Sequence, residues 1–316
     1  MKILVTGGAG FIGSNFINYW LSKHVEDNVI NLDKLTYAAN PNYVWHEHFK
    51  GRYTLVQGDI TDSNLVEQLV NDSDCIVNFA AESHVDNSIG MPGQFISSNY
   101  VGTFTLLEAA RKSDVRFHQI STDEVFGSLP IDSAELFNEN TSYHPNNPYS
   151  ASKAGADLLV RSYVNTYGLN ATISNCSNNF GPNQHAEKLI PKTIVLASKN
   201  QKIPLYGNGL QIRDWIYVED HCRAIEKVLL NGKKGESYLV SARNEQRNID
   251  VVKMILSLMN KDYSLIDFVK DRPGHDVRYA IDPTKIETEL GWKPKYNFSN
   301  ALEITVKHYM HFLISP

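Results

Sequence analysis

Three glycines spaced by three, Gly7, Gly10 and Gly13, follow a short apolar run at residues 3–5. Glycines at this spacing let the backbone turn tightly, approach a diphosphate closely and pack the following helix against a sheet. The helix expected to start at Phe11 would direct free N–H groups and its positive dipole end at that diphosphate. The alternative is an ordinary tight turn between a strand and a helix. The strand before, the helix after and Asp33, 20 positions beyond Gly13, all argue for the dinucleotide turn.

Asp33 ends the second apolar run, and Asp59 and Ile60 close the third. An acid at the end of the second strand accepts hydrogen bonds from an adenosine ribose and repels a 2′-phosphate. NAD is therefore favoured over NADP. By the same geometry Asp59 and Ile60 would lie near the adenine. The alternatives are a solvated acid for Asp33 and a helix-capping acid for Asp59.

Short apolar runs alternate with helical patterns through the first 180 residues. Their nearly continuous hydrophobicity is typical of strands that are covered on both faces. Repeated strand–helix units predict an α/β fold with a doubly wound parallel sheet of the Rossmann type. The predicted strands are residues 3–5, 29–32, 53–56, 75–79, 117–120 and 171–174, and the predicted helices are residues 11–21, 63–69, 94–112 and 148–167.

Proline and glycine break the chain into shorter pieces after residue 175. We expect residues 1–175 to form an NAD-binding domain, joined by a returning segment near 210–230. Residues 176–316 would form most of a smaller, interleaved α/β lobe that binds the substrate. The elements predicted there are a helix at 219–230, a strand at 238–240, a helix at 248–259 and a final helix from about residue 299.

Composition excludes several other classes of protein. The chain is 42% hydrophobic and 21% charged, with a net charge of −5 and no run of like charges, which argues against binding nucleic acid. Cys75, Cys176 and Cys222 are far apart, so we expect neither a disulfide framework nor a metal site. No apolar run approaches the ~20 residues of a membrane span, and no signal peptide is recognised. We therefore expect a cytoplasmic protein that does not contact a membrane.

Tyr149 and Lys153 lie four residues apart on a predicted helix, so both face one side. A free tyrosine has a pKa near 10 and is a poor base at neutral pH. A lysine ammonium and a positive nicotinamide ring would both favour the phenolate. Such a phenolate would take a proton from a substrate hydroxyl while the carbon gives hydride to the nicotinamide. An incidental aromatic residue beside a surface lysine is the alternative.

Thr122, Asp123 and Glu124 follow the fifth predicted strand. Doubly wound folds bind ligands at the carboxyl ends of their strands, so this triplet would face the crevice that holds Tyr149. Thr122 would hydrogen-bond the same hydroxyl as Tyr149. Two adjacent acids in a crevice indicate divided roles, one protonated and one ionised. The alternative is that the two acids cap a loop or a helix.

Together these motifs resemble the extended short-chain dehydrogenase/reductase superfamily. The triplet Thr122, Asp123 and Glu124 is the most diagnostic element, because related 4-epimerases and decarboxylases do not usually carry its acid pair. Longer strings are similar to the dTDP-glucose 4,6-dehydratases almost from end to end, at residues 80–86, 121–127, 178–182, 187–191, 213–215, 271–276 and 278–282.

The resemblance implies an NAD-dependent hydro-lyase. Tyr149 would deprotonate the C4 hydroxyl of the hexose as NAD takes the C4 hydride, and Glu124 would then remove the C5 proton. Asp123, protonated, would donate to the departing C6 hydroxyl. Hydride return to C6 would give dTDP-4-keto-6-deoxyglucose and regenerate NAD. The resemblance also implies a homodimer, formed through the helices predicted at 94–112 and 149–167.

The same resemblance implies catalytic and binding residues. The catalytic set is Thr122, Asp123, Glu124, Tyr149 and Lys153. The NAD neighbours would be Gly7, Gly10, Phe11, Ile12, Gly13, Asp33, Lys34, Leu35, Thr36, Asp59, Ile60, Phe79, Ala80, Ala81, Ser98, Tyr149, Lys153 and Asn179. The nucleotide sugar would be held by Ser83, Thr122, Asn178, Lys188, Leu189, Pro204, Leu205, Tyr206, Arg213, Asn244, Arg272 and His275.

Physical chemistry supports part of the substrate set. Lys188, Arg213 and Arg272 would supply cations for two phosphates, and Leu189 or Tyr206 would flank the base. The alternatives are solvated surface charges for the cations and a turn-stabilising role for His275.

Three other functions stay open. The first is a 4,6-dehydratase of another nucleotide sugar, such as UDP-N-acetylglucosamine. The second is a nucleotide-sugar 4-epimerase, which would need Tyr149, Lys153 and Thr122 but not the acid pair. The third is a nucleotide-binding module without activity, serving regulation or assembly, against which the complete catalytic set argues.

Overall fold

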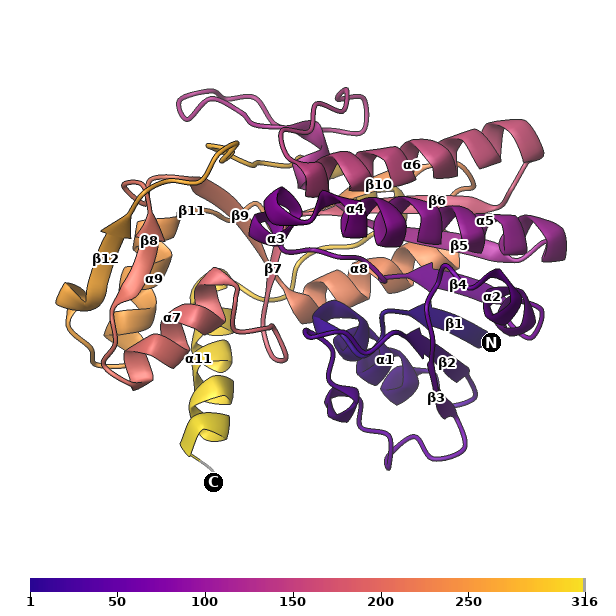
Figure 1. Ribbon diagram of the computed structural model, residues 1–316, viewed down its shortest axis with the longest axis horizontal. Coiled ribbons are helices and arrows are strands. Elements are labelled where there is room, and N and C mark those ends of the chain that lie inside the picture. Colours follow the sequence, from indigo (N-terminus) through magenta and orange to yellow (C-terminus); the bar gives the residue numbers. More distant parts are fainter. Residues whose placement is uncertain (315–316) are drawn as a thin grey trace.

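The computed structural model describes residues 1–314 and is built around a seven-stranded parallel sheet (Figure 1). The strand order is β10-β6-β5-β4-β1-β2-β3, and every neighbouring pair is parallel. The chain therefore winds outward from β1 in both directions, which confirms the doubly wound α/β prediction. The strands are β1 (Lys2–Thr6), β2 (Asn28–Asp33), β3 (Tyr53–Gln57), β4 (Cys75–Asn78), β5 (Arg116–Thr122), β6 (Ala171–Cys176) and β10 (Ser237–Val240).

Helices cover both faces of this sheet, and each face has its own apolar core (Figure 1). Phe16, Trp20 and Cys222 are fully buried on one face, and Leu107 and Val160 are buried on the other. This two-sided cover is why the central strands are apolar along their whole length. The first face carries α1 (Phe11–Lys23) and α8 (Val218–Asn231), and the second carries α2 (Ser63–Val70), α5 (Gly102–Ser113) and α6 (Pro148–Tyr167).

The two edges of the sheet differ from the sequence prediction. The run at 53–56 forms the edge strand β3, where Thr54 is exposed and its neighbours are half-buried, so the prediction that this run is covered on both faces is wrong. The opposite edge is β10, a segment far along the chain that pairs with β6. The sheet therefore has seven strands, one more than the pattern in the first 180 residues predicts.

The helix predicted at 94–112 is also not a single α-helix. It is α4 (Pro92–Phe95), a π-helical turn η2 (Ile96–Val101) and then α5, and it follows the short helix α3 (Val85–Gly90). A π-helical turn is common at functional sites. Here Ser97 and Ser98 of the turn line the large cavity described below.

A smaller group of elements lies beside the carboxyl ends of the main strands (Figure 1). One sheet has the order β11-β9-β7, and a second pairs β12 with β8. The core of this smaller group includes the buried rings of Phe180, Trp215 and Phe298. The elements of this group are β7 (Asn178–Phe180), α7 (Leu189–Ser198), β8 (Ile203–Tyr206), β9 (Ile212–Tyr217), β11 (Glu245–Arg247), α9 (Asn248–Leu258), η4 (Tyr263–Leu265), β12 (Ile266–Val269) and α11 (Phe298–Ile314). The helix α10 (Thr284–Leu290) packs against β10 and α8, and the 3₁₀ turns η1 (Pro41–Tyr43) and η3 (Asp123–Phe126) pack against α1 and α6 of the main group.

The elements predicted after residue 175 are confirmed as α8, β10, α9 and α11. Two of them, α8 and β10, belong to the main sheet and its cover, so the chain crosses between the two groups more than once. The boundary predicted at residue 175 stays a prediction. Within residues 1–314 none of the helices has the length and apolar character that crossing a bilayer requires.

Candidate active site

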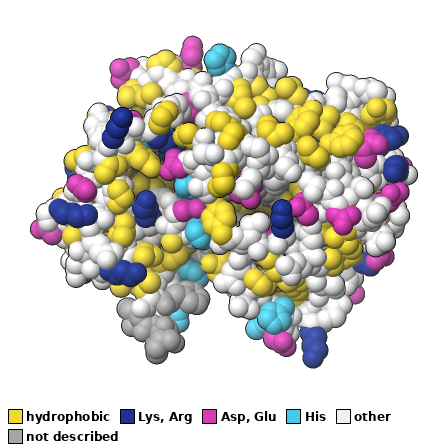
Figure 2. Space-filling model, viewed as in Figure 1, with side chains coloured by type: hydrophobic (Ala, Val, Ile, Leu, Met, Phe, Trp, Pro, Cys, Tyr) yellow, Lys and Arg dark blue, Asp and Glu magenta, His cyan; other side chains and the backbone are white. Residues whose placement is uncertain are grey.

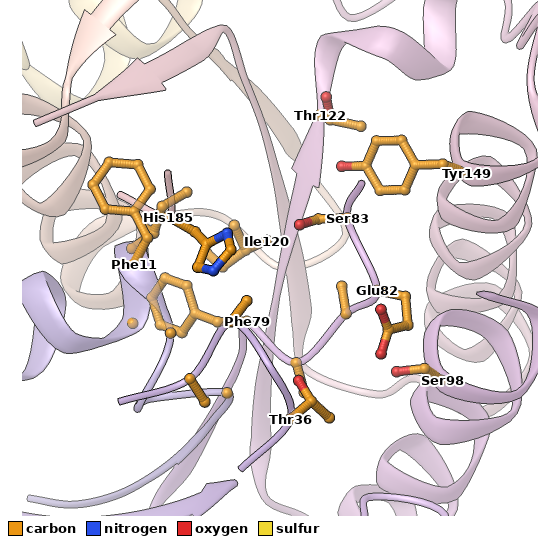
Figure 3. Close-up of a pocket in the computed structure, with 18 of the residues that line it drawn as sticks. Phe11, Thr36, Phe79, Glu82, Ser83, Ser98, Ile120, Thr122, Tyr149 and His185 are labelled. Carbon is orange, nitrogen blue, oxygen red and sulfur yellow. The ribbon is translucent and has the colours of Figure 1, made fainter. Parts of the chain in front are cut away.

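A cavity of about 720 Å³ opens at the carboxyl ends of the central strands, where β1 lies between β2 and β4. This is the position at which doubly wound sheets bind ligands. The glycine turn and the ends of β2, β4 and β5 form its walls, together with α6 and residues 176–188. In Figure 3, Tyr149 and Thr122 lie on one side of the cavity, and Phe11, Phe79 and His185 lie on the other.

The three glycines of the turn are needed for different reasons. Gly7 has φ +71°, and a Cβ there would come within 2.7 Å of the Ala80 nitrogen. A Cβ on Gly13 would collide with the Gly7 carbonyl oxygen and approach the Gly8 Cα to 2.8 Å. A Cβ on Gly10 would meet only the Gly7 oxygen, at 3.3 Å, and otherwise face open space. Gly7 and Gly13 therefore build the turn, whereas Gly10 keeps the start of α1 open to the cavity.

The end of β2 offers an acid to the same cavity. The two carboxylate oxygens of Asp33 each accept a hydrogen bond from a main-chain amide, that of Ala9 at 2.8 Å and that of Leu35 at 2.8 Å. Burial nevertheless raises the pKa of Asp33. Lys34, just after β2, forms an ion pair of 2.7 Å with Asp59, just after β3. The open helix start and this acid fit the diphosphate and ribose of a dinucleotide.

Tyr149 and Lys153 are placed by the start of α6. Asn147 caps the helix by accepting a hydrogen bond from the Ser150 amide at 2.9 Å, and Pro148 occupies the first turn. Tyr149 is buried, and its hydroxyl points into the cavity between Thr122 and Ser83 (Figure 3). The Lys153 ammonium donates to the Ile120 carbonyl oxygen at 2.7 Å.

In the protein alone, burial and the nearby Glu124 hold the pKa of Tyr149 well above its ordinary value. Burial also lowers the pKa of Lys153. The lowered pKa that the sequence predicts depends on two cations, the lysine ammonium and a positive nicotinamide ring, so it stays a prediction. A phenolate at this position needs further positive charge in the cavity.

The acid pair occupies the turn that follows β5. Thr122 ends the strand and accepts a hydrogen bond from the Glu124 amide at 3.3 Å. Burial, and next the charge of Glu124, raise the pKa of Asp123 well above its usual range. Burial also raises the pKa of Glu124, but Arg272, Lys188 and Arg213 oppose that shift. Burial therefore favours the protonated form of both acids, and only Glu124 has three cations among the groups that oppose it.

Most of the predicted cofactor residues line this cavity, as do all five catalytic candidates and four of the substrate candidates. Leu35 does not line it, although its amide bonds to Asp33. The lining residues that the sequence predicted are Gly7, Gly10, Phe11, Ile12, Gly13, Asp33, Lys34, Thr36, Asp59, Ile60, Phe79, Ala80, Ala81, Ser83, Ser98, Thr122, Asp123, Glu124, Tyr149, Lys153, Asn178, Asn179 and Lys188.

Several lining residues were not predicted. Tyr37, Glu82, His185 and Glu187 come from loops on opposite sides of the cavity, and the Tyr37 hydroxyl donates to Glu187 at 3.4 Å. The Tyr37 ring also meets the His185 ring edge-on, with 5.5 Å between their centres. Glu82 and Glu187 lie in the strings 80–86 and 187–191 that carry the resemblance, but only the fold brings their loops together with Tyr37 and His185.

The remaining substrate candidates lie outside the cavity lining. Tyr206 donates to one oxygen of Asp86 at 2.9 Å, and Arg272 pairs with the other oxygen at 3.3 Å. Asp86 belongs to α3, so these contacts join the smaller group of elements to the main one. The residues outside the lining are Leu189, Pro204, Leu205, Tyr206, Arg213, Asn244, Arg272 and His275.

Two of these residues, Arg213 and His275, make contacts within the protein. Arg213 is buried, donates to the carbonyl oxygens of Ile212 and Asp276, and lies 4.2 Å from the ring centre of Tyr279. His275 bonds to Asp271 at 2.5 Å, which is the turn-stabilising role raised as its alternative. Among the residues that the structure describes, no group of three or more His, Cys, Asp or Glu side chains is placed to hold a metal ion.

Comparison with known proteins gives a consistent result. Residues 4–305 match the family model described as GDP-mannose 4,6 dehydratase. The chain is 50% identical over 310 residues to the dTDP-glucose 4,6-dehydratase of Mycobacterium tuberculosis (strain H37Rv), covering 98% of this chain and 93% of that one. It is 47% identical to dTDP-glucose 4,6-dehydratase 1 of Escherichia coli (strain K12), with the same coverage.

Solved structures agree with these relatives. The dTDP-glucose 4,6-dehydratase DesIV of Streptomyces venezuelae, solved with NAD bound, matches with a TM-score of 0.95 and 43% identity over 98% of this chain and 97% of that one. The UDP-glucose 4-epimerase of Thermus thermophilus, in complex with NAD, matches with a TM-score of 0.90 and 26% identity, covering 98% and 99%.

Proposed function

Since this chain belongs to the GDP-mannose 4,6-dehydratase family, we propose that it is an NAD-dependent hydro-lyase that converts dTDP-glucose into dTDP-4-keto-6-deoxyglucose. The observation that carries the proposal is the acid pair Asp123–Glu124 in the same cavity as Tyr149 and Lys153. An epimerase needs a base for one hydroxyl only. Removing water from a sugar needs, in addition, a base for a carbon-bound proton and an acid for the leaving hydroxyl.

The glycine turn and Asp33 would hold the dinucleotide along one side of the cavity. When bound, NAD would accept hydride from C4 and return it to C6, and its ring would add the positive charge that Tyr149 needs. Tyr149 and Thr122, whose side chains lie together in Figure 3, would hold the C4 hydroxyl and take its proton. Lys153 would contribute its ammonium charge from the next turn of α6.

Glu124 and Asp123 divide the elimination between them. Three cations favour the ionised form of Glu124, and Ser150 donates to its carboxylate at 3.4 Å, so Glu124 would remove the C5 proton. Asp123 has one buried oxygen without a hydrogen-bond partner and a strongly raised pKa, so it would carry the proton that the C6 hydroxyl needs. These roles follow the rule that paired acids with separated pKa values act as base and acid.

Incubation with a panel of nucleotide sugars tests the proposal. The protein is given dTDP-glucose, UDP-glucose and UDP-N-acetylglucosamine in turn, and mass spectrometry follows the loss of one water. Loss of water from dTDP-glucose is the expected result. Loss of water only from UDP-N-acetylglucosamine would move the proposal to another substrate, and a C4-inverted isomer of unchanged mass would indicate an epimerase. No change in any sugar would favour a binding module.

We also propose that the protein is a homodimer through the face formed by η2, α5 and α6. This face exposes six large apolar or aromatic side chains, and a gathered apolar patch of this kind marks a protein–protein interaction site. Figure 2 shows apolar side chains gathered at the upper right, where α5 and α6 lie in Figure 1. The six residues are Ile96, Tyr100, Val101, Phe104, Leu158 and Tyr167.

Light scattering tests the dimer. Phe104→Glu puts a charge at this face and is expected to convert the dimer to a monomer. Phe268→Glu is the matched control, because Phe268 is also exposed but lies on β12 in the smaller group of elements. A monomeric mass for the unaltered protein, or a dimer that survives Phe104→Glu, would contradict this part of the proposal.

A further inference from the structure

Asp157 is a completely buried carboxyl on α6 for which the proposed mechanism has no role. Its Oδ2 atom accepts hydrogen bonds from Ser121 Oγ at 2.6 Å, Tyr143 Oη at 3.1 Å and Asn175 Nδ2 at 3.2 Å. Its Oδ1 atom is buried without a hydrogen-bond partner. A buried charge that is only partly hydrogen-bonded is costly, so its presence calls for a physical reason.

Lys153 supplies that reason. It lies four residues before Asp157, so both side chains extend from the same face of α6. Lys153 is itself buried, and its one described hydrogen bond goes to the uncharged Ile120 carbonyl. Burial lowers the pKa of Lys153, and Asp157 is the group that opposes this shift most strongly. The effect is mutual: burial raises the pKa of Asp157, and Lys153 is the group that opposes this shift most strongly.

Asp157 also holds the strand end that carries the acid pair. Ser121, which donates to Asp157, immediately precedes Thr122 in β5. Asn175, which donates to Asp157 from β6, also donates to the Thr122 carbonyl oxygen at 3.2 Å. A single carboxylate therefore connects the helix that carries Tyr149 and Lys153 with the strand that ends at Thr122.

The other titratable groups around this pair do not take over its role. Burial raises the pKa of the Cys176 thiol to about 12, so that thiol is neutral beside Lys153. Tyr143, in the loop before α6, donates to Asp157 and also accepts from Arg161 of that helix. The other groups on the elements packed against α6 include Asp86 of α3, Tyr100 of η2, Glu108, Arg111 and Lys112 of α5, Arg116 and His118 of β5, and Asp123 and Glu124 of η3. On α6 itself they are Tyr149, Arg161, Tyr163 and Tyr167, and Glu108 bonds to Tyr163 near the far end of the helix. Burial lowers the pKa of His118 to about 3, so that ring is neutral.

We propose that Asp157 is a positioning residue of the active site: the buried counter-ion that keeps Lys153 charged, and the anchor that fixes the Thr122 end of β5 against α6. Without the carboxylate charge, Lys153 would be a buried ammonium facing neutral groups, and it would lose its proton at a lower pH. The phenolate of Tyr149 would then lose the cation beside it.

Titration of the Lys153 amine measures how strongly Asp157 holds the proton on Lys153. The protein is labelled with ¹⁵N at the lysine side chains, and the Lys153 signal is identified by its absence in Lys153→Met. We expect Asp157→Asn to lower the midpoint of this titration by about one pH unit or more. Tyr143→Phe is the matched control, because it removes one hydrogen bond from Asp157 and keeps the charge. A midpoint in Asp157→Asn that is not lowered by about one unit more than in the control would overturn the proposal.

The reciprocal measurement covers the case in which Asp157→Asn does not fold. Because two coupled groups act on each other equally, Lys153→Met must raise the pKa of the Asp157 carboxyl, observed by ¹³C labelling of aspartate side chains. A rise of about one unit or more supports the proposal, and a smaller rise contradicts it. The Asp157 carboxyl signal is assigned through its bonds to the Asp157 backbone, so the assignment does not depend on the Lys153 variants.

The inference concerns the site of the proposed function, but neither titration requires turnover. Both are carried out on the protein with and without added NAD, and no sugar is present. A protein that fails to dehydrate any sugar while both midpoints shift would contradict the proposed function alone. Normal dehydration with unshifted midpoints would contradict the role of Asp157 alone.

Discussion

The glycine turn yields a prediction in which two similar substitutions have different results. Gly13→Ala places a methyl group against the Gly7 carbonyl oxygen and 2.8 Å from the Gly8 Cα, so the turn and α1 have to move apart. Gly10→Ala places a methyl group at the open start of α1, where its nearest neighbour is the Gly7 oxygen at 3.3 Å. Gly10 has an extended backbone, with φ −81° and ψ 179°, which alanine adopts without strain.

The expected magnitudes follow from these contacts. Overpacking of main-chain atoms costs about 1–3 kcal/mol, so Gly13→Ala is expected to lower the Tm by several degrees. Gly10→Ala is expected to cost less than about 1 kcal/mol, the range for a changed helix cap. The methyl group of Gly10→Ala would occupy the space of the diphosphate and would displace the diphosphate from the amides of α1. A tenfold or greater loss of NAD affinity corresponds to about 1.4 kcal/mol.

Thermal unfolding and an NAD titration of the unaltered protein, Gly10→Ala and Gly13→Ala check the prediction. We expect Gly10→Ala to keep the Tm and lose NAD affinity, and Gly13→Ala to lose both. Unchanged NAD affinity in Gly10→Ala would refute the assignment of the turn to the cofactor. An unchanged Tm in Gly13→Ala would refute the steric reasoning.

Further predictions concern the acids. Glu124→Gln is expected to abolish exchange of the C5 hydrogen with deuterated water, which NMR of the recovered sugar measures. Asp123→Asn is expected to keep this exchange but to slow the loss of water about 10²–10⁴-fold. Equal effects in both variants would refute the division of roles. Glu226 of α8 accepts hydrogen bonds from three side chains of α1 and its C-terminal cap, including Tyr19 at 2.6 Å and Lys23 at 2.7 Å, so Glu226→Gln is expected to cost about 1–3 kcal/mol of unfolding free energy at neutral pH. Burial alone would raise the pKa of Glu226, but these bonds outweigh burial and lower it. The stability that Glu226 contributes is therefore present above its unfolded pKa and is lost as the pH falls through its folded pKa. Denaturant unfolding of both proteins from neutral to acidic pH should therefore converge, and a constant difference would contradict this explanation.

Local signals in the sequence were sufficient for much of the fold and for one half of the site. Apolar runs identify buried parallel strands because the strands are covered on both faces, and the glycine turn is specified by contacts within a few residues. The acid pair is found because Thr122 ends a strand whose carboxyl end faces the crevice. In each case the residues that determine the structure or carry the chemistry lie close together in the sequence.

Features that depend on distant contacts could not be predicted in this way. Tyr37 and His185 meet over the cavity from loops about 150 positions apart, and β10 completes the sheet from beyond residue 236. The raised pKa of Tyr149 results from burial, which no local pattern records. Arg213 was predicted to face phosphate, but its contacts with Asp276 and Tyr279 depend on how a distant loop folds back.

The most direct test of the account follows one hydrogen atom through the reaction. dTDP-glucose carrying deuterium at C4 is converted by the protein in ordinary water, and the product is examined by NMR and mass spectrometry. We predict that the deuterium is recovered in the methyl group at C6, because the hydrogen leaves C4 and returns within one closed cavity. Product whose methyl group carries no deuterium, so that its third hydrogen came from water, would contradict the account.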